Sequence, residues 1–271
     1  MQRSFVDSTI MTNDLKPVRR DQLKQDRSAP HPQPLLGSDI HVWCASLEFP
    51  PQELEGLFHL LSPDEKKRAE RFYFERDRNR FIAGRGLLRT IISHYLEIEP
   101  SQIEFIYGSY GKPALKSALQ DKTFEFNVSH SKDLALYIFS WDRKVGIDVE
   151  YVRPMPDTND FAGQFFSPSE SGFVNSLSGK QKDDAFFKIW TCKEAFLKAN
   201  GSGLTLPINQ VEISLEAEGS AILRSIGGDK TQAAPWHLET FNPVPGYQAA
   251  LAVEGHMRHI IFQKLNGYLV G

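Results

Sequence analysis

Ser62-Pro63-Asp64-Glu65 recurs in pattern as Ser167-Pro168-Ser169-Glu170, about 105 residues further along the chain. In both stretches a serine precedes a proline and a glutamate follows, which is how a helix with a capping box begins. Around each stretch the order is a strand, helices and then three strands. Although this order is common enough to arise by coincidence, the repeated cap favours a duplicated α+β unit. The predicted fold is a pseudo-dimer of two similar α/β halves, and ligand sites often lie at such interfaces.

Hydrophobic periodicity and turn residues predict the elements of each half. In the first half we expect strands over residues 40–46, 103–107, 124–129 and 134–139, and helices over 51–61, 62–74 and 78–96. In the second half we expect strands over 145–150, 211–215, 236–241 and 248–253, a helix from Ser167, and a long helix over 183–200 that Gly201 ends.

Residues 1–37 differ from the rest of the chain in composition. They combine scattered charges with a proline-spaced stretch, Pro30-His31-Pro32-Gln33-Pro34. This composition predicts a flexible N-terminal extension. The two predicted halves then cover residues 38–143 and 144–271.

The composition excludes several classes of function. The 271-residue chain has a formal net charge of −3, which does not favour a nucleic-acid binder. Its two cysteines, Cys44 and Cys192, have no metal-ligand spacing, so a disulfide framework or a zinc site is not expected. No apolar run reaches membrane-spanning length, and the N-terminus lacks the apolar core of a secretory signal. We therefore expect a cytoplasmic protein with no membrane or nucleic-acid partner.

Two acidic stretches point to chemistry. Gly146-Ile147-Asp148-Val149-Glu150 follows an apolar run, and strand alternation places Asp148 and Glu150 on one face. Glu194 and Lys198 are one turn apart on the long helix, among bulky apolar residues, so these charges need partners. Taken singly, the first stretch is better explained as an acidic strand end, and the second as an ordinary helix-surface pair. Together, three carboxylates and a lysine suit Mg²⁺ and a phosphate-bearing substrate.

Two polar turns are further candidates for binding phosphate. Ser129 and His130 end a strand, where they either cap a turn or donate hydrogen bonds to a phosphate oxygen. Lys112 and Pro113 follow two glycines in a turn that is either a plain loop or a place where the backbone approaches a ligand. Both interpretations stay open on the sequence.

The segment from Lys66 to Arg89 is rich in arginine and lysine. Most of these charges are expected on a solvated helix face. Arg80 and Arg85 differ, because the residues between them are small or apolar. Guanidinium groups in such a place suit bidentate contacts with phosphate.

Four motifs taken together resemble the Sfp-type 4′-phosphopantetheinyl transferases. They are Gly-Lys-Pro at 111–113, Asn-Val-Ser-His-Ser at 127–131, Gly-Ile-Asp-Val-Glu at 146–150 and Trp-x-x-Lys-Glu-x-Phe-x-Lys at 190–198. The resemblance implies a pseudo-dimer with coenzyme A in the cleft between the halves. It also implies a Mg²⁺-dependent transfer of the 4′-phosphopantetheine group from coenzyme A to a serine of an apo acyl, peptidyl or polyketide carrier protein. The other product is adenosine 3′,5′-bisphosphate.

The resemblance assigns the catalytic and metal-binding residues to the second half. Asp148, Glu150 and Glu194 would bind Mg²⁺ together with the diphosphate. Lys198 would neutralise diphosphate charge. Either Glu194 or a metal-bound water would take the proton of the serine hydroxyl.

The resemblance assigns coenzyme A binding mainly to the first half. Arg80 and His130 would hold phosphates with Ser129 nearby, Arg68 would contact the 3′-phosphate, and Lys112 and Pro113 would lie along the adenine. The chain departs from the family pattern at Glu65, where a lysine is usual, and at Phe81, where a hydroxyl residue is sometimes found. Glu194 has no carboxylate counterpart about 105 residues earlier, where Arg89 stands.

Two other functions compete with this hypothesis. A metal-dependent nuclease or phosphatase could use the Asp148, Glu150 and Glu194 cluster, but the charge balance and the Gly-Lys-Pro turn count against it. A carrier-binding module without catalysis is disfavoured because all three carboxylates and Lys198 are present. We therefore expect a holo-[carrier-protein] synthase that serves fatty-acid, polyketide or nonribosomal peptide synthesis. Because the duplication is internal, we expect a monomer.

Overall fold

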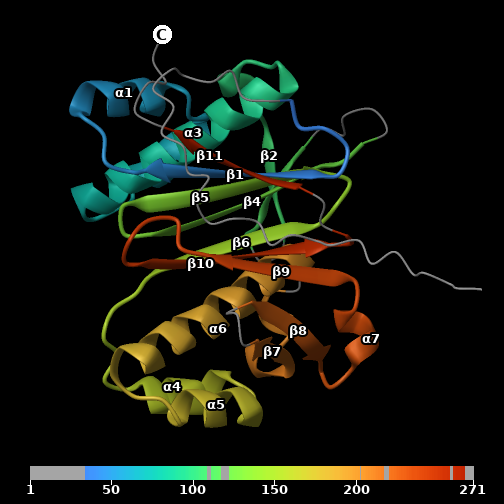
Figure 1. The fold of residues 1–271 in the computed structure, drawn as a ribbon. Helices are drawn as coiled ribbons and strands as arrows, with labels where there is room; N and C mark the ends of the chain where they lie inside the picture. Colours follow the sequence, from blue (N-terminus) through green and yellow to red (C-terminus); the bar gives the residue numbers. More distant parts are fainter. Residues whose placement is uncertain are drawn as a thin grey trace, which may run out of the picture. The chain divides into compact units, whose positions relative to one another are not determined.

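The computed structural model describes residues 34–108, 111–116, 122–201, 203–216, 220–256 and 259–265. Figure 1 shows their arrangement as layers of helix and sheet. Most of the predicted N-terminal extension, residues 1–33, lies outside the described residues, so its flexibility stays a prediction. None of the described helices is both long and apolar enough to cross a membrane.

The first half follows the predicted order of elements. It consists of β1 (Asp39–Ser46), α1 (Pro51–His59), α2 (Pro63–Ala69), α3 (Glu75–Leu96), a 3-10 turn (Pro100–Gln102), β2 (Phe105–Tyr107), β3 (Pro113–Leu115), β4 (Phe124–Ser131) and β5 (Leu134–Trp141). Strands β2 and β3 form a short antiparallel hairpin.

The second half repeats this order and adds to it. It consists of β6 (Val145–Tyr151), α4 (Thr158–Phe165), α5 (Pro168–Asn175), α6 (Gly179–Asn200), two 3-10 turns (Gly203–Thr205 and Ile208–Gln210), β7 (Val211–Leu215), β8 (Ala221–Ile226), α7 (Lys230–Ala233), β9 (Trp236–Phe241), β10 (Tyr247–Glu254) and β11 (His259–Leu265). Gly201 ends α6 in the left-handed conformation, with φ of 73°, as its position predicted.

The strand order of the sheets confirms the duplicated α+β fold. One sheet has the order β11-β1-β5-β4 and the other β6-β10-β9, so that β1-β5-β4 matches β6-β10-β9. The hairpins β2-β3 and β7-β8 occupy corresponding places in the two halves. Strand β11 breaks the symmetry, because it pairs in parallel with β1, from Asp39 opposite His259 to Ala45 opposite Leu265. The last described strand of the chain therefore belongs to the sheet of the first half.

Apolar side chains form three buried clusters between the layers of helix and sheet. Ile92 and Phe139 belong to the cluster between the first sheet and its helices. Ile138 and Ile147 belong to the cluster between the two sheets. Phe196 of α6 belongs to the third cluster, in which α6 packs against the other helices and strands of the second half. Burial of this apolar surface supplies the main driving force for folding and fixes each sheet against its neighbours.

The boundary between α2 and α3 differs from the prediction. Helix α2 ends at Ala69 rather than near Phe74, and α3 begins at Glu75 rather than near Arg78. Acidic residues in the first turn of a helix, here Glu75 and Asp77, stabilise its N-terminus, and this signal indicates the observed start.

Five elements are not predicted by the sequence, namely β3, α4, β8, α7 and β11. Strand β3 begins at Pro113, inside the glycine-rich turn, for which no strand was predicted. Strand β11 is an outer strand that contains charged residues, and its partner β1 lies more than two hundred residues earlier in the chain. Such short or long-range elements depend on tertiary contacts that local periodicity does not reveal.

The capping-box glutamate of each half also neutralises a buried cation on the long helix. In the first half, Glu65 accepts a hydrogen bond from the Ser62 amide at 3.0 Å and pairs with Arg89 at 2.7 Å. In the second half, Glu170 pairs with Lys193 at 2.7 Å, and both side chains are at most 1% exposed. Buried charges persist only when paired and hydrogen-bonded, so these two ion pairs fix α3 on α2 and α6 on α5.

The two cations bind their surroundings in the same way. Arg89 donates to the carbonyl oxygens of Pro100 at 2.7 Å and Ile103 at 2.9 Å. Lys193 donates to the carbonyl oxygens of Ile208, at 3.1 Å, and Val211. In the first half these acceptors span the 3-10 turn after α3, and in the second half they span the second of the two 3-10 turns after α6.

This equivalence corrects the predicted match between the long helices. Arg89 corresponds to Lys193 rather than to Glu194, because the two ion pairs are equivalent. The residue that corresponds to Glu194 is then Thr90. The conclusion that the first half has no carboxylate at this position is unchanged.

Replacing Lys193 by methionine should lower the free energy of unfolding by about 3–5 kcal/mol, because Glu170 would be left charged and buried. Urea denaturation at neutral pH measures this loss. The matched control is Lys180→Met, which breaks the exposed Lys180–Asp184 pair on the same helix and should change stability by less than about 1 kcal/mol. Equal effects of the two substitutions would contradict a buried ion pair.

Candidate active site

Helix α6 lies directly on strand β6 because residue 146 is glycine. A Cβ atom built on Gly146 would collide with the carbonyl oxygen of Ala195 and the amide nitrogen of Ala199, and would lie 2.9 Å from the Ala199 Cβ. Only a residue without a side chain fits at this contact. The close approach brings Glu194 and Lys198 of α6 beside the carboxylates of β6.

Three carboxylates lie near one another at this contact. Burial raises the pKa of Glu150, and the charge of Asp148 raises it further. Burial followed by the charge of Asp148 likewise raises the pKa of Glu194. Both shifts have the same two causes, burial first and repulsion by a neighbouring carboxylate second, and each disfavours the ionised form. Within the described ranges, no three side chains of Asp, Glu, His or Cys are placed so that they could hold a metal ion as they stand.

Lys198 supplies the positive charge closest to Asp148. Its Nζ lies 2.5 Å from Asp148 Oδ1 and donates to Ser129 Oγ at 3.0 Å. The Ser129 hydroxyl donates to the same Asp148 oxygen at 2.8 Å. The other oxygen, Asp148 Oδ2, is buried and has no hydrogen-bond partner among the described residues. A buried acceptor without a partner is unfavourable, so this oxygen is open to a cation or a ligand donor.

His130 is influenced by two cations. Burial lowers its pKa, and the charges of Lys198 and Arg80 lower it further, against a smaller opposite effect of Asp148. The imidazole is therefore neutral at pH 7 and can donate one hydrogen bond. The two cations beside it create a positive potential that favours an anionic ligand.

Arg80 is fixed by an aspartate in the turn between β4 and β5. Its Nε donates to Asp133 Oδ1 at 2.7 Å, and its Nη2 lies 2.6 Å from the same oxygen. Phe81 follows Arg80 in the chain, and the guanidinium carbon of Arg68 on α2 lies 5.3 Å from the centroid of the Phe81 ring. The structure therefore brings Arg80, His130 and Lys198 into one electrostatic neighbourhood and places Arg68 next to it.

Arg85 points in another direction. Its side chain is 13% exposed and its Nε lies 3.4 Å from Glu65 Oε1. Its guanidinium lies over the rings of Phe105 and Tyr107, at 5.3 and 5.9 Å from their centroids. Glu65 therefore pairs with arginines of the first half. A lysine, which the family pattern has at this position, could not form these ion pairs. Contact of Arg85 with phosphate stays a prediction.

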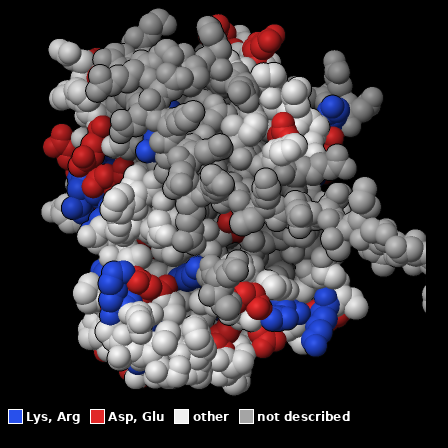
Figure 2. All heavy atoms as spheres, in the orientation of Figure 1, with Lys and Arg blue, Asp and Glu red and all other residues white. Residues whose placement is uncertain are grey.

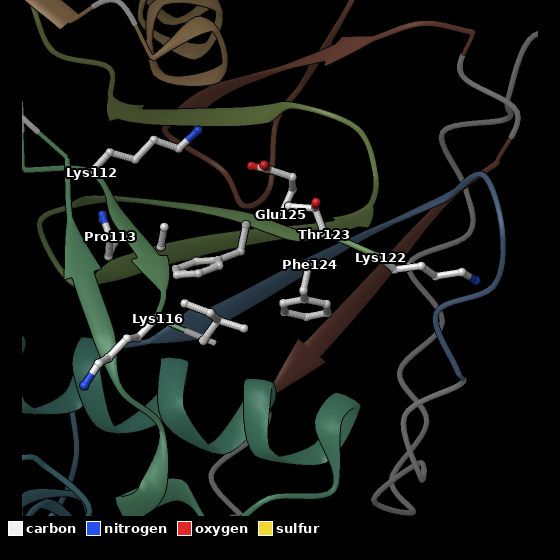
Figure 3. A pocket seen from close by; sticks show the side chains of 10 residues that line it. Lys112, Pro113, Lys116, Lys122, Thr123, Phe124 and Glu125 are labelled. Carbon is white, nitrogen blue, oxygen red and sulfur yellow. The ribbon is translucent and has the colours of Figure 1, made fainter. Parts of the chain in front are cut away.

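Lys112 and Pro113 line a separate pocket of about 260 Å³, formed by residues 112–116 and 122–126 (Figure 3). Phe124 and Phe126 contribute its aromatic lining. Figure 3 shows the side chains of Lys112 and Glu125 extending to the same side of the strands. Burial lowers the pKa of Lys112, whereas the charge of Glu125 acts in the opposite direction. A small pocket with an apolar wall and a charged rim suits a flat polar ring.

Two residues of this site are not predicted by the sequence. Ser131 donates a hydrogen bond to Glu150 Oε2 at 2.9 Å, and Asp133 holds Arg80. The sequence does carry a signal for Ser131: it lies two residues after Ser129, and alternate residues of a strand share a face. No local signal indicates Asp133, because its partner lies on a distant helix.

Models of a single protein family match both halves of the chain. The N-terminal model of 4′-phosphopantetheinyl transferases matches residues 48–140, and the model of the 4′-phosphopantetheinyl transferase superfamily matches residues 144–252. The 4′-phosphopantetheinyl transferase HetI of Nostoc sp. strain PCC 7120 is 43% identical over 82% of this chain and 90% of HetI. This chain belongs to the 4′-phosphopantetheinyl transferase family. The transferase Sfp of Bacillus subtilis strain 168 is 30% identical over 74% of this chain and 85% of Sfp.

Family membership confirms the predicted enzyme class. The chain is a phosphopantetheinyl transferase of the Sfp type, as the four motifs indicated. The nuclease or phosphatase alternative is not favoured by these relationships.

Replacing Gly146 by alanine should destabilise the transferase by about 1–3 kcal/mol, because the methyl group meets backbone atoms of α6 rather than flexible side chains. Glu194 and Lys198 would be displaced with the helix, so activity should fall as well. The control is Gly163→Ala in α4, where nothing lies within 4 Å of the added Cβ and stability should rise by about 0.5–1 kcal/mol. Urea denaturation distinguishes the two variants.

Replacing Glu194 by glutamine should stabilise the transferase near pH 7 when divalent cations are absent, because it removes a carboxylate whose ionisation is disfavoured. The raised folded pKa means that this penalty is present above that pKa and disappears as pH falls toward the unfolded value, about 4.3. Thermal unfolding with EDTA should therefore show a higher Tm for the variant at pH 7 and a smaller difference near pH 4.5. The exposed Glu55→Gln change should have no such pH dependence. A lower Tm for Glu194→Gln at pH 7 would contradict this account.

Proposed function

We propose that the chain transfers the 4′-phosphopantetheine group of coenzyme A to a serine of an apo carrier protein, with Mg²⁺ held by Asp148, Glu150 and Glu194. The observation that carries this proposal is the Asp148 carboxylate. Lys198 and Ser129 hold its Oδ1, whereas its buried Oδ2 has no partner among the described residues. Two further carboxylates with raised pKa values stand beside it.

The donor chemistry of this cluster fits a hard divalent cation. All three side chains offer carboxylate oxygens, which Mg²⁺ prefers. A bound cation would offset the burial and the mutual repulsion that raise the pKa values of Glu150 and Glu194. When bound, Mg²⁺ orients a diphosphate and offsets the charge that grows on the leaving group.

Lys198 acts directly on the diphosphate. Its ammonium group is fixed by Asp148 and Ser129 at one end of the carboxylate cluster. From this position it stabilises negative charge on the leaving phosphate without having to reorganise during the reaction. Ser129 contributes by holding both Asp148 and Lys198.

Glu194 is the residue that accepts the proton of the carrier serine. A serine hydroxyl is weakly acidic, so a carboxylate base beside it assists the reaction when the geometry is good. Glu194 lies close enough to Asp148 and Lys198 for their charges to act on it, which places it where the diphosphate is bound. The deprotonated serine oxygen then attacks phosphorus, and adenosine 3′,5′-bisphosphate leaves with the electron pair of the broken phosphorus–oxygen bond.

Residues of the first half bind the remainder of coenzyme A. Arg80 and His130 hold phosphate oxygens, and Arg68 reaches the 3′-phosphate from the neighbouring helix. Lys112 and Pro113 bind the adenine at the pocket shown in Figure 3. The two arginines provide planar donor groups that match phosphate geometry.

The distribution of charge supports a small anionic substrate over a nucleic acid. On the face of the described residues in Figure 2, Lys and Arg side chains stand beside Asp and Glu side chains rather than in a broad basic surface. A nucleic-acid substrate requires extended phosphate neutralisation. The cations near His130 form instead a small group that fits one or two phosphates.

The site draws its residues from both halves of one chain, which supports a monomer as the active form. Asp148, Glu194 and Lys198 come from the second half, and Arg80 and His130 from the first. The partner is an apo carrier protein with an exposed serine, of the fatty-acid, polyketide or peptide synthase class. A cytoplasmic location would place the enzyme with coenzyme A and these synthases.

Incubation with coenzyme A, Mg²⁺ and an apo acyl carrier protein should increase the carrier mass by one phosphopantetheine. Intact-protein mass spectrometry measures the product, and EDTA should abolish it. Asp148→Ala and Glu194→Ala should each lower kcat at least about 100-fold, because charge stabilisation and proton transfer are lost.

The control for these variants is Glu55→Gln, an exposed carboxylate on α1 that should leave activity unchanged. No mass increase with carriers of the acyl, peptidyl and polyketide classes would refute the function. Full activity of Glu194→Ala would refute the role of Glu194 while leaving the function intact.

A further inference from the structure

Strands β4 and β6 meet through side chains rather than through a backbone ladder. β4 ends one sheet and β6 ends the other, so neither is the hydrogen-bonded neighbour of the other. Buried backbone amides on such an edge still require acceptors. The amide of Ile147 on β6 donates to the side-chain oxygen of Asn127 on β4 at 3.0 Å.

The same arrangement repeats twice along the strands. The amide of Val149 donates to Ser129 Oγ at 3.3 Å, and the amide of Tyr151 donates to Ser131 Oγ at 3.1 Å. Each contact joins residues 20 positions apart, so the two strands run in the same direction and keep one register. We call these three contacts the β4–β6 ladder.

The ladder determines where the serine hydroxyl hydrogens point. A backbone amide can only donate, so each serine oxygen must accept from it. The single hydroxyl hydrogen is then left for another acceptor, and in both cases that acceptor is a carboxylate of β6. Ser129 donates to Asp148 and Ser131 donates to Glu150, at 2.8 and 2.9 Å.

We propose that Ser131 is a positioning residue that holds the Glu150 carboxylate through the β4–β6 ladder. This inference rests on the proposed function, because it assigns Glu150 to cation binding. Ser131 is the clearer of the two serines to test, since Ser129 also receives a hydrogen bond from Lys198. Through the ladder, the same two serines of β4 bind the backbone of β6 and orient its carboxylates, Asp148 and Glu150.

The position of Glu150 on its strand makes such a support necessary. Glu150 has a longer side chain than Asp148, is only half-buried, and repels the neighbouring carboxylates. Without Ser131 its carboxylate would lose the described hydrogen bond that draws it toward β4. Residues that orient a metal ligand typically affect metal affinity about 10- to 100-fold.

Binding of Mn²⁺ to the full chain tests this role without relying on turnover. Electron paramagnetic resonance of free Mn²⁺, with and without coenzyme A, gives the Kd for wild type, Ser131→Ala and Ser131→Thr. Ser131→Ala should weaken Mn²⁺ binding about 10- to 100-fold. Ser131→Thr keeps the hydroxyl and should bind Mn²⁺ nearly as tightly as wild type.

A matched control removes a buried hydroxyl from a neighbouring strand. Ser140 on β5 is 1% exposed and donates to the Arg143 carbonyl oxygen at 2.6 Å, away from the carboxylates of β6. Ser140→Ala should leave the Mn²⁺ Kd unchanged, even if its Tm falls. In transfer assays, Ser131→Ala should raise the Mg²⁺ concentration for half-maximal rate while leaving the KM for coenzyme A close to wild type.

Several results would overturn the inference. They are an unchanged Mn²⁺ Kd in Ser131→Ala, equal losses in Ser131→Ala and Ser140→Ala, weak binding by Ser131→Thr, or no Mn²⁺ binding by wild type. The proposed function is judged separately, by the mass increase that wild type produces on a carrier. If wild type modifies the carrier and Ser131→Ala binds Mn²⁺ normally, only the role of Ser131 fails.

Discussion

The buried ion pair between Glu170 and Lys193 is the interaction on which the geometry of the site depends. Glu170 caps α5 through the Ser167 amide at 2.7 Å, accepts from the Ile213 amide at 2.6 Å and neutralises Lys193. Such pairs add little net stability compared with apolar packing, but they are directional. Successive residues of an α-helix are about 100° apart around its axis. When Lys193 is fixed toward α5, the direction of Glu194 is fixed as well. Glu194 therefore faces the neighbourhood of Asp148.

The equivalent pair in the first half serves a different purpose. Glu65 neutralises Arg89 and also attracts Arg85, so two arginines are held inside that half. The cations that remain near the carboxylate cluster include Arg80, fixed by Asp133, and Lys198 from the opposite half. Duplication thus supplies two copies of one scaffold, and divergence gives one copy the carboxylates and the other much of the charge that we propose binds phosphate.

Much of the fold follows from local sequence. The two capping boxes, the C-terminal ends of the long helices and the strands at 211–215 and 236–241 lie where periodicity and caps predict them, whereas α3 and α6 begin three and four residues earlier than predicted. Strand alternation was enough to place Asp148 and Glu150 on one face, and helical spacing to place Glu194 one turn from Lys198. The outer strand β11 was missed because its partner β1 is distant in sequence, and α4 was missed because it is only eight residues long.

The sequence by itself determined the duplicated architecture and the enzyme family, and it singled out the carboxylates that we propose as metal ligands, because caps, alternation and motifs are local patterns. Only the tertiary structure decided which charged groups meet. It turned Arg85 toward Glu65, placed Asp133 on Arg80 and aligned Asn127, Ser129 and Ser131 with the amides of β6. The physical reason is that a buried charge or amide takes the partner that packing brings within hydrogen-bond distance, and no local pattern encodes that partner.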